Sequence, residues 1–210
     1  MTILESMEVR WFLPPDPARD ALLTTWFDSA TAEGAREDSY LRTGRPDLGI
    51  KLRHATATAA KLETKYLVGT HGSIEIAPTM SGRLERWQKL SMKVDDPRGS
   101  SESWLVMQKD RRMRKFAFDG GHAFEVGPTE QVQAGAGLEL TILRFSEDGQ
   151  ETVITTLGLE AFGPSSDLLT IFEHTCRRAF ADAPAVTLQD IDSLSYPAWL
   201  ARRASATQLG

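Results

Sequence analysis

The sequence predicts an α+β protein whose centre is a closed antiparallel β-barrel of about eight strands. Short segments of alternating apolar and polar residues fill most of the chain from about residue 38 to residue 162. Turn-forming residues separate these segments, which is typical of antiparallel barrels and sandwiches. Helical periodicity follows the first strand and returns in the C-terminal third. We therefore expect an N-terminal helix and C-terminal helices packed outside the barrel.

Composition and charge are those of one folded domain in a reducing compartment. The chain has 210 residues, 41% hydrophobic and 25% charged, and we expect a single domain over residues 1–203 with a loose tail over 204–210. The net charge of -5 argues against nucleic-acid binding, which usually needs a basic domain. The one cysteine, Cys176, cannot form an internal disulfide and is expected to be a buried thiol. The sequence has no secretory signal and no apolar run of membrane-spanning length, which predicts a cytoplasmic protein without membrane contact.

The first strand is predicted over residues 5–13, and the first helix follows it directly. Two prolines interrupt the strand, and Asp16 then caps a helix with Pro17 at its first position, a favoured arrangement. We expect this helix to end by Gly34. Its apolar stripe consists of Leu22, Leu23, Trp26 and Phe27.

Most of the later chain is predicted to be strand. The segments are residues 49–54, 61–68, 73–78, 83–92, 103–109, 114–118, 122–126, 137–145 and 151–162. The turns expected between them lie at Thr43-Gly44, Gly69-Thr70, Pro97 to Gly99 and Asp119-Gly120-Gly121.

The C-terminal third changes to the helical period. Ser165 or Ser166 is expected to cap a helix that ends before Pro184. Residues 188–194 and 195–204 are expected to form two shorter helical pieces.

Charged residues share one face on many of the predicted strands. Because side chains alternate across a strand, Glu8 and Arg10 lie on the face opposite to Val9 and Trp11. The same pattern pairs Lys51 with Arg53, Glu63 with Lys65, Arg83 with Glu85, and Lys109 with Arg111, and it sets Glu139 and Glu160 opposite apolar neighbours.

This alternation allows two arrangements. In most antiparallel sheets, charged faces point to water and apolar faces to the core. In the other arrangement, charged faces line the lumen of a barrel and helices cover its apolar exterior. Two like charges 4 Å apart repel by roughly 4 kcal/mol at an effective dielectric of about 20, so a charged lumen needs interleaved carboxylates or a bound polyanion. Periodicity alone leaves both arrangements open.

Several familiar sites are excluded by the sequence. It has no Gly-rich phosphate loop ending in Gly-Lys-Ser/Thr, no His-Glu-x-x-His, no Gly-x-Ser-x-Gly and no cysteine pair for zinc. The four histidines are scattered, and we expect them to have surface or core roles.

The order of the remaining motifs resembles the CYTH-type proteins, the triphosphate tunnel metalloenzymes. The matching segments are SMEVRWF, a helix, DSYLRTGRPDLGIKLR and LETKYL, and the resemblance covers most of residues 3–162, most strongly 3–66. LTILRF, TTLGLEAFG and SYPAWL are similar to a branch of CYTH-like proteins of uncertain activity. The resemblance implies a closed antiparallel tunnel in which basic residues hold a triphosphate and acidic residues hold Mg²⁺ or Mn²⁺.

Carried over by position, the resemblance implies a set of site residues. The expected phosphate-binding residues are Arg10, Lys51, Arg53, Lys65, Lys109, Arg111 and Arg114, although the sequence does not determine strand parity over residues 109–115. The expected metal ligands are Glu8, Glu139 and Glu160. The acidic set is incomplete, because Ser6 stands where the family has its first glutamate and Thr141 follows Glu139 in the late strand. Arg10 stands where the family has lysine, and its planar fork suits bidentate phosphate contact.

Three functions follow from these patterns. The first is metal-dependent hydrolysis of a triphosphate group, inorganic or organic. The second is a catalytically silent tunnel that binds a small phosphorylated ligand, because the basic residues are more complete than the acidic ones. The third is a β-barrel with a cavity for an apolar ligand, in which the charged faces lie outside. The sequence identifies no residue that activates water.

Overall fold

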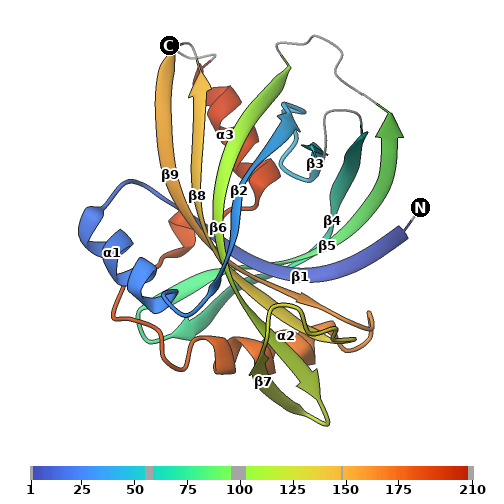
Figure 1. Ribbon diagram of the computed structural model, residues 1–210, viewed down its shortest axis with the longest axis vertical. Coiled ribbons are helices and arrows are strands. Elements are labelled where there is room, and N and C mark those ends of the chain that lie inside the picture. The colour runs from blue at the N-terminus through green and yellow to red at the C-terminus, as the bar shows by residue number, and fades with distance from the viewer. Residues whose placement is uncertain (1, 55–58, 96–102, 148, 208–210) are drawn as a thin grey trace.

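Eight strands close into an antiparallel barrel, which confirms the predicted fold class. A computed structural model describes residues 2–54, 59–95, 103–147 and 149–207 (Figure 1). Its strands are β1 (Thr2–Leu13), β2 (Thr31–Leu41), β3 (Leu48–His54), β4 (Ala59–Ala77), β5 (Met80–Asp95), β6 (Trp104–Asp119), β7 (His122–Val126), β8 (Gly135–Glu147) and β9 (Gln150–Phe162). The strand order is β2-β3-β4-β5-β1-β9-β8-β6-β7, and pairing of β2 with β6 closes the barrel. β7 lies outside the ring and pairs only with β6 among the described strands.

The strands are longer than the sequence segments predict. Residues 61–68 and 73–77 belong to one strand, β4, whose register shifts between Leu67 and Gly69 and again between Thr70 and Gly72. The predicted turn at Gly69-Thr70 is therefore wrong, because the chain forms bulges there and continues. Residues 103–109 and 114–118 likewise join within β6. The turn predicted at Pro97 to Gly99 lies outside the described residues.

The helix after the first strand forms where expected and ends before Gly34, as expected. α1 (Pro17–Trp26) begins at Asp16, whose side chain accepts hydrogen bonds from the backbone N–H groups of Ala18 and Arg19, both at 3.1 Å. The helix stops eight residues before Gly34. β2 begins at Thr31, where its pairing with β6 starts, and Asp38 to Tyr40 also pair with β3, so β2 completes the ring.

The C-terminal helices differ in detail from their predicted limits. The N-cap position of α2 (Leu168–Ala179) is Asp167 and not Ser165 or Ser166, and the Asp167 side chain makes no capping hydrogen bond. Within residues 188–194, helix is limited to the 3₁₀ turn η1 (Asp190–Asp192). α3 (Tyr196–Thr207) extends through residues 204–207, which were expected to be part of a loose tail. Among the described residues, no helix combines the length and apolar character needed to cross a membrane.

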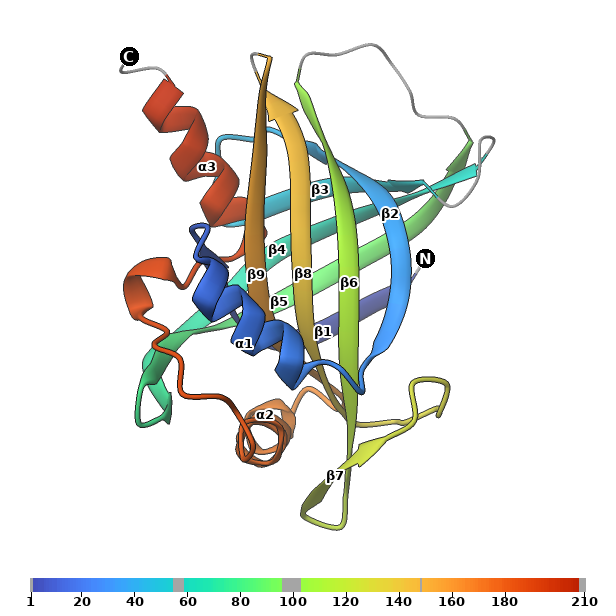
Figure 2. The same ribbon diagram turned by 60° about the vertical axis from the view of Figure 1, so that its left-hand side comes forward.

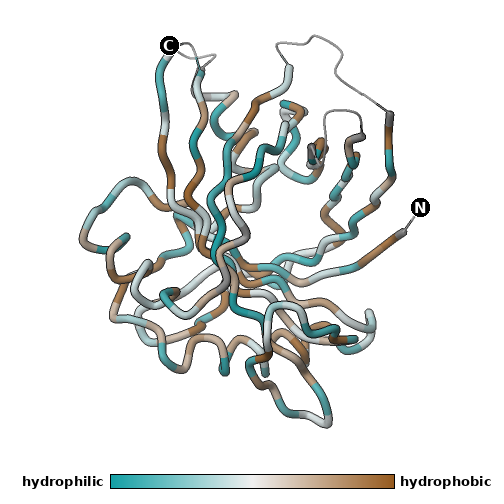
Figure 3. The backbone as a smooth tube through the Cα atoms, viewed as in Figure 1, coloured by the Kyte–Doolittle hydropathy of each residue, from teal (hydrophilic) through white to brown (hydrophobic). Residues whose placement is uncertain are grey.

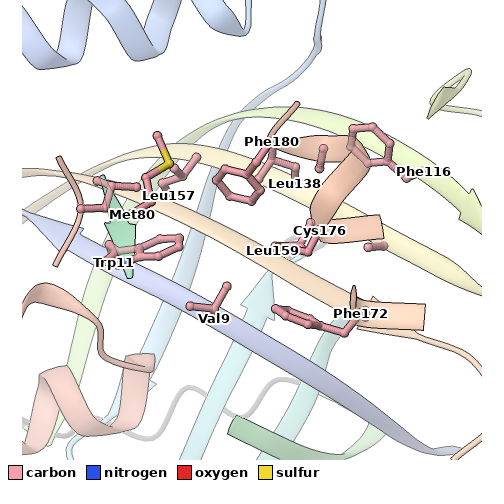
Figure 4. Packing of buried hydrophobic residues seen from close by; sticks show 14 of the residues in the cluster. Val9, Trp11, Met80, Phe116, Leu138, Leu157, Leu159, Phe172, Cys176 and Phe180 are labelled. Atoms are coloured by element: carbon pink, nitrogen blue, oxygen red, sulfur yellow. The ribbon is translucent and has the colours of Figure 1, made fainter. Parts of the chain in front are cut away.

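The apolar faces of the strands lie on the barrel exterior under α1 and α2. Val9 and Trp11 of β1 and Leu157 and Leu159 of β9 pack with Phe172, Cys176 and Phe180 in one buried cluster (Figure 4). The Trp11 indole N–H donates a 2.8 Å hydrogen bond to the carbonyl oxygen of Ser81. Cys176 is buried, as predicted, and burial raises the pKa of its thiol to about 12.

A second cluster closes one end of the barrel. Trp199 and Leu200 of α3 pack with Phe12, Tyr40 and other lumen-phase residues, including Leu105, Met107, Leu143 and Phe145. Phe12 stacks on Trp199 with ring centroids 4.7 Å apart. Figure 2 shows α3 beside β9, away from the N-terminal end of β1, while α2 lies below the strands. α3 therefore seals the end of the lumen where β1 finishes.

We predict that truncating the helix that covers the exterior destabilises the fold. Phe172→Ala removes a fully buried ring from α2 and should lower the free energy of unfolding by about 3–5 kcal/mol. Leu169→Ala, on the exposed side of the same helix, should change it by no more than about 0.5 kcal/mol. Urea denaturation of both variants measures the difference, and equal losses would show that α2 does not cover the core in this way.

Candidate functional site

The barrel encloses a charged cavity of about 750 Å³. Hydrophilic and hydrophobic residues alternate along the barrel strands (Figure 3), and the hydrophilic set faces inward. Within the described residues, the basic side chains in the lining are Arg10, Arg36, Lys51, Arg53, Lys65, Lys89, Lys109 and Arg111, and the acidic ones are Glu5, Glu8, Glu63, Glu139 and Glu160. The third functional alternative, an apolar cavity with charges outside, is therefore wrong.

The two ends of the cavity differ. At the closed end the lining includes Tyr196 and Pro197 of α3. At the other end it includes Ile3 and Leu4, whose side chains are about half exposed. A ligand therefore enters from the end where β1 begins.

Lysine is confined to the lumen phase of the strands. The register sets Lys51 opposite Tyr40 and Glu63, Lys65 opposite Lys89, and Lys61 opposite Arg53 and Lys93. Lys109 lies opposite Arg36, and Lys115 lies opposite Gly137, which is itself opposite Glu160. All seven lysines of the sequence thus stand at strand positions whose register matches that of the residues lining the cavity.

Arg10 links two carboxylates of the lumen. Its Nε donates to Glu8 Oε1 at 2.8 Å, and its Nη1 donates to Glu139 Oε1 at 3.0 Å. Gly158 makes room for this side chain, because a Cβ there would lie 2.7 Å from the Arg10 guanidinium carbon. Burial opposes the charge on Arg10, but Glu139 and Glu8 outweigh it and raise its pKa well above the usual value.

The Glu139 carboxylate contacts donor groups from three strands, β1, β6 and its own strand β8. Besides Arg10, its Oε2 lies 3.2 Å from Arg111 Nε, and its Oε1 accepts a 2.9 Å hydrogen bond from the Thr141 hydroxyl. Burial favours the neutral carboxyl, but Arg10 and Arg111 outweigh it and hold the pKa of Glu139 well below its usual range.

Lys65 lies between Glu8 and a further carboxylate, Glu160. Its ammonium donates to Glu8 Oε2 and lies 3.4 Å from Glu160 Oε1. Glu8 and Glu160 are direct register partners on β1 and β9. Burial lowers the pKa of Lys65, but Glu160 and Glu8 more than reverse this, while Lys65 in turn lowers the pKa of Glu160.

Lys109 is held by aromatic groups near the closed end. Its ammonium donates to the Tyr40 hydroxyl at 2.6 Å and lies 3.9 Å from the centroid of the Tyr196 ring. Burial lowers the pKa of Lys109 to about 7, against the opposing effect of Asp38. Burial and the nearby Lys109 charge lower the pKa of Lys51 to about 8. These two lysines are therefore close to losing their charge near neutral pH.

The structure brings together all the predicted site residues except Arg114. That side chain lies on the exterior face of β6, where its Nε and Nη2 donate to Glu125 at 2.9 and 2.8 Å, and it also contacts Asp182. The placement of Arg114 with the phosphate-binding residues is therefore wrong. Strand parity is the reason: Lys109 and Arg111 face inward, and an even-numbered neighbour in the same strand faces outward.

Sequence reasoning missed other lumen residues. Arg36, Asp38 and Tyr40 alternate along β2 and face inward, and Tyr196 reaches the lumen from α3. The alternation in REDSY (residues 36–40) is a usable signal for the first three, but the strand segments predicted from the sequence do not include it. Tyr196 carried no such signal, because its helix reaches the lumen only through tertiary packing.

The three predicted metal ligands do not fit a shared metal site. Glu8, Glu139 and Glu160 are separated by cationic side chains, with Arg10 between the first pair and Lys65 between Glu8 and Glu160. Within the part of the chain that the structure describes, no group of three Asp, Glu, His or Cys residues could hold a metal ion. A divalent cation between Glu8 and Glu160 would compete with the Lys65 ammonium.

Comparisons with known proteins give little beyond the geometry. No family model matches the chain, and no curated protein matches it. Among solved structures, the chain is similar to the Pct1 RNA triphosphatase of S. pombe, with a TM-score of 0.41 and 11% sequence identity, over 98% of this chain and 82% of that one. This likeness is too slight to support an argument about function.

We predict that Arg10 is needed to neutralise two buried carboxylates of the lumen, Glu8 and Glu139. Arg10→Met leaves Glu8 and Glu139 with less compensation and should lower the free energy of unfolding by about 3 kcal/mol or more. Arg45→Met breaks an exposed pair with Asp47 and should leave the free energy of unfolding close to that of the wild type. Urea denaturation near neutral pH measures both, and similar small losses would mean that the Arg10 contacts are energetically unimportant.

Proposed function

We propose that the barrel lumen binds a small phosphorylated molecule that carries several phosphate groups, such as an inorganic or organic triphosphate. The observation that carries this proposal is the set of eight Lys and Arg side chains directed into one cavity within the described barrel. Cations of this kind form the strongest hydrogen bonds with phosphate oxygens. The chain as a whole is acidic, at -5, so the basic lining is a local feature and not a general property of the surface.

The shape of the cavity supports a small ligand. α3 closes one end, so a polymer cannot pass through the barrel. Guanidinium groups contribute planar pairs of donors at Arg10, Arg53 and Arg111, and the lysines contribute compact charges. The lumen thus provides donors of both kinds in one cavity.

Hydrolysis of the bound triphosphate is a second candidate, as the resemblance to triphosphate tunnel metalloenzymes implies. The observation that favours it is the direct pairing of Glu8 with Glu160 on the lumen faces of β1 and β9. Lys65 lies between these two carboxylates, and Glu8 also pairs with Arg10. Because both acids already neutralise protein cations, binding without hydrolysis is the first candidate.

We predict that ligand affinity depends on the inward face of β6 and not on its outward face. Arg111→Gln should weaken the binding of inorganic triphosphate roughly tenfold or more, equal to about 1.4 kcal/mol, because it removes a charged donor from the lumen. Arg112→Gln is the matched control, since Arg112 lies next in the strand and pairs with Asp28 at 3.5 Å on the exterior. Isothermal titration calorimetry measures both affinities. Undetectable binding by the wild type, or equal weakening by both variants, would contradict the proposal.

The same samples separate binding from hydrolysis. Binding in EDTA should stay within a few-fold of binding with Mg²⁺, because the cations of the lumen belong to the protein. Phosphate release from triphosphate with Mg²⁺, Mn²⁺ or EDTA is then measured for the wild type and Glu8→Ala. Metal-dependent release that disappears in Glu8→Ala would establish the second candidate in place of silent binding.

We predict that binding takes up protons just above neutral pH. Lys109 and Lys51 have pKa values of about 7 and 8, and a polyanion beside them should raise both. Protonation therefore accompanies binding, and affinity should fall as pH rises from about 7 to about 9. Titrations at about pH 8 in two buffers of different ionisation enthalpy give the number of protons taken up. A value of zero, with affinity independent of pH, would show that neither lysine contacts the ligand.

A further inference from the structure

Two buried carboxylates flank the basic strand β3 and are not explained by ligand binding alone. Asp38 on β2 is opposite Arg53, and Glu63 on β4 is opposite Lys51. Their exposed fractions are 0% and 3%. Both lie on the lumen side of the barrel, among residues that the proposed function assigns to phosphate.

Both carboxylates already form ion pairs with the cations around them. Lys51 Nζ lies 3.0 Å from Glu63 Oε2 and 3.9 Å from Asp38 Oδ2. Asp38 also lies 3.1 Å from Arg36 Nη2 and 3.5 Å from Lys109 Nζ. Glu63 also lies 3.0 Å from Lys61 Nζ and 3.8 Å from Arg53 Nη2.

Both acids are ionised near neutral pH. Burial favours the neutral form of each, but Lys51 with Lys61 lowers the pKa of Glu63, and Lys51 with Lys109 lowers the pKa of Asp38. Two negative charges are thus fixed within the basic part of the cavity before any ligand arrives.

We propose that Asp38 and Glu63 are specificity-determining counter-ions, which make the lumen select for densely charged ligands and reject single phosphates. This inference rests on the proposed function. A phosphate oxygen that approaches Lys51 must displace a carboxylate contact, and the negative charges of both acids repel it. An orthophosphate has too few contacts to offset this repulsion. A triphosphate reaches further cations, including Arg10 and Arg111, and these contacts compensate for it.

The test compares three ligands on matched variants. Orthophosphate, diphosphate and triphosphate are titrated calorimetrically into the wild type, Glu63→Gln and Asp38→Asn at about pH 6, where Lys51, whose pKa is about 8, keeps its charge. Glu125→Gln is the control, because it breaks an equally short pair with Arg114 outside the cavity. We expect both lumen variants to bind orthophosphate at least tenfold more tightly than the wild type does, and to discriminate less between the three ligands. The control should keep the wild-type ratios.

The outcomes separate this inference from the function on which it rests. If the wild type binds triphosphate but the affinity ratios are unchanged in Glu63→Gln and Asp38→Asn, the counter-ion role is wrong and the proposed function stands. If neither the wild type nor the variants bind any of the three ligands, both are wrong. Circular dichroism checks the fold of each variant, and either lumen variant alone carries the test if the other does not fold.

Discussion

The structure depends on the neutralisation of charge inside the barrel. Cations buried this deeply are costly unless opposite charges lie beside them. Arg10 meets this requirement by bonding to Glu8 in its own strand and to Glu139 on β8, while Lys65 on β4 bonds back to Glu8. These contacts join strands that are not hydrogen-bonded neighbours, since β9 lies between β1 and β8 and β5 lies between β4 and β1, so the polar interior itself contributes to the closure of the barrel. An apolar core could also hold the barrel closed, but it would be less sensitive to the loss of a single side chain than these paired charges are.

The polar interior moves the hydrophobic core to the outside of the barrel. Trp11, Leu157 and Leu159 face outward, and α1 and α2 must cover them because an apolar surface of that size would otherwise remain in water. α3 has a different role, since Trp199 enters the end of the lumen and stacks on Phe12. The helices therefore determine both how the sheet is stabilised and how deep the cavity is. A ligand site with one open end is the result.

The interior charges also divide into two groups with different consequences. Around Arg10, acids and bases on β1, β8 and β6 alternate in one chain of contacts, and removing one member leaves a buried charge without compensation. Around Lys51, two acids, Asp38 and Glu63, form ion pairs with five bases, so positive charge is in excess. The bases are Arg36, Lys51, Arg53, Lys61 and Lys109. Lys51 and Lys109 respond to this excess and to burial with lowered pKa values, of about 8 and 7. An anionic ligand is the natural complement of this part of the lumen.

The sequence by itself determined which residues share a face, because side-chain alternation with period 2 is a local property of a strand. It therefore grouped Glu8 with Arg10 and Lys51 with Arg53 correctly, and it gave the cap at Asp16 from local hydrogen-bonding preferences. It did not resolve the phase of β6, so Arg114 was predicted on the wrong face, and its predicted strand segments did not include REDSY (residues 36–40), although this segment closes the ring. Only the tertiary structure decided which face lies inside. That choice depends on the pairing of β2 with β6 and on the docking of helices from the far end of the chain, and a local pattern contains neither.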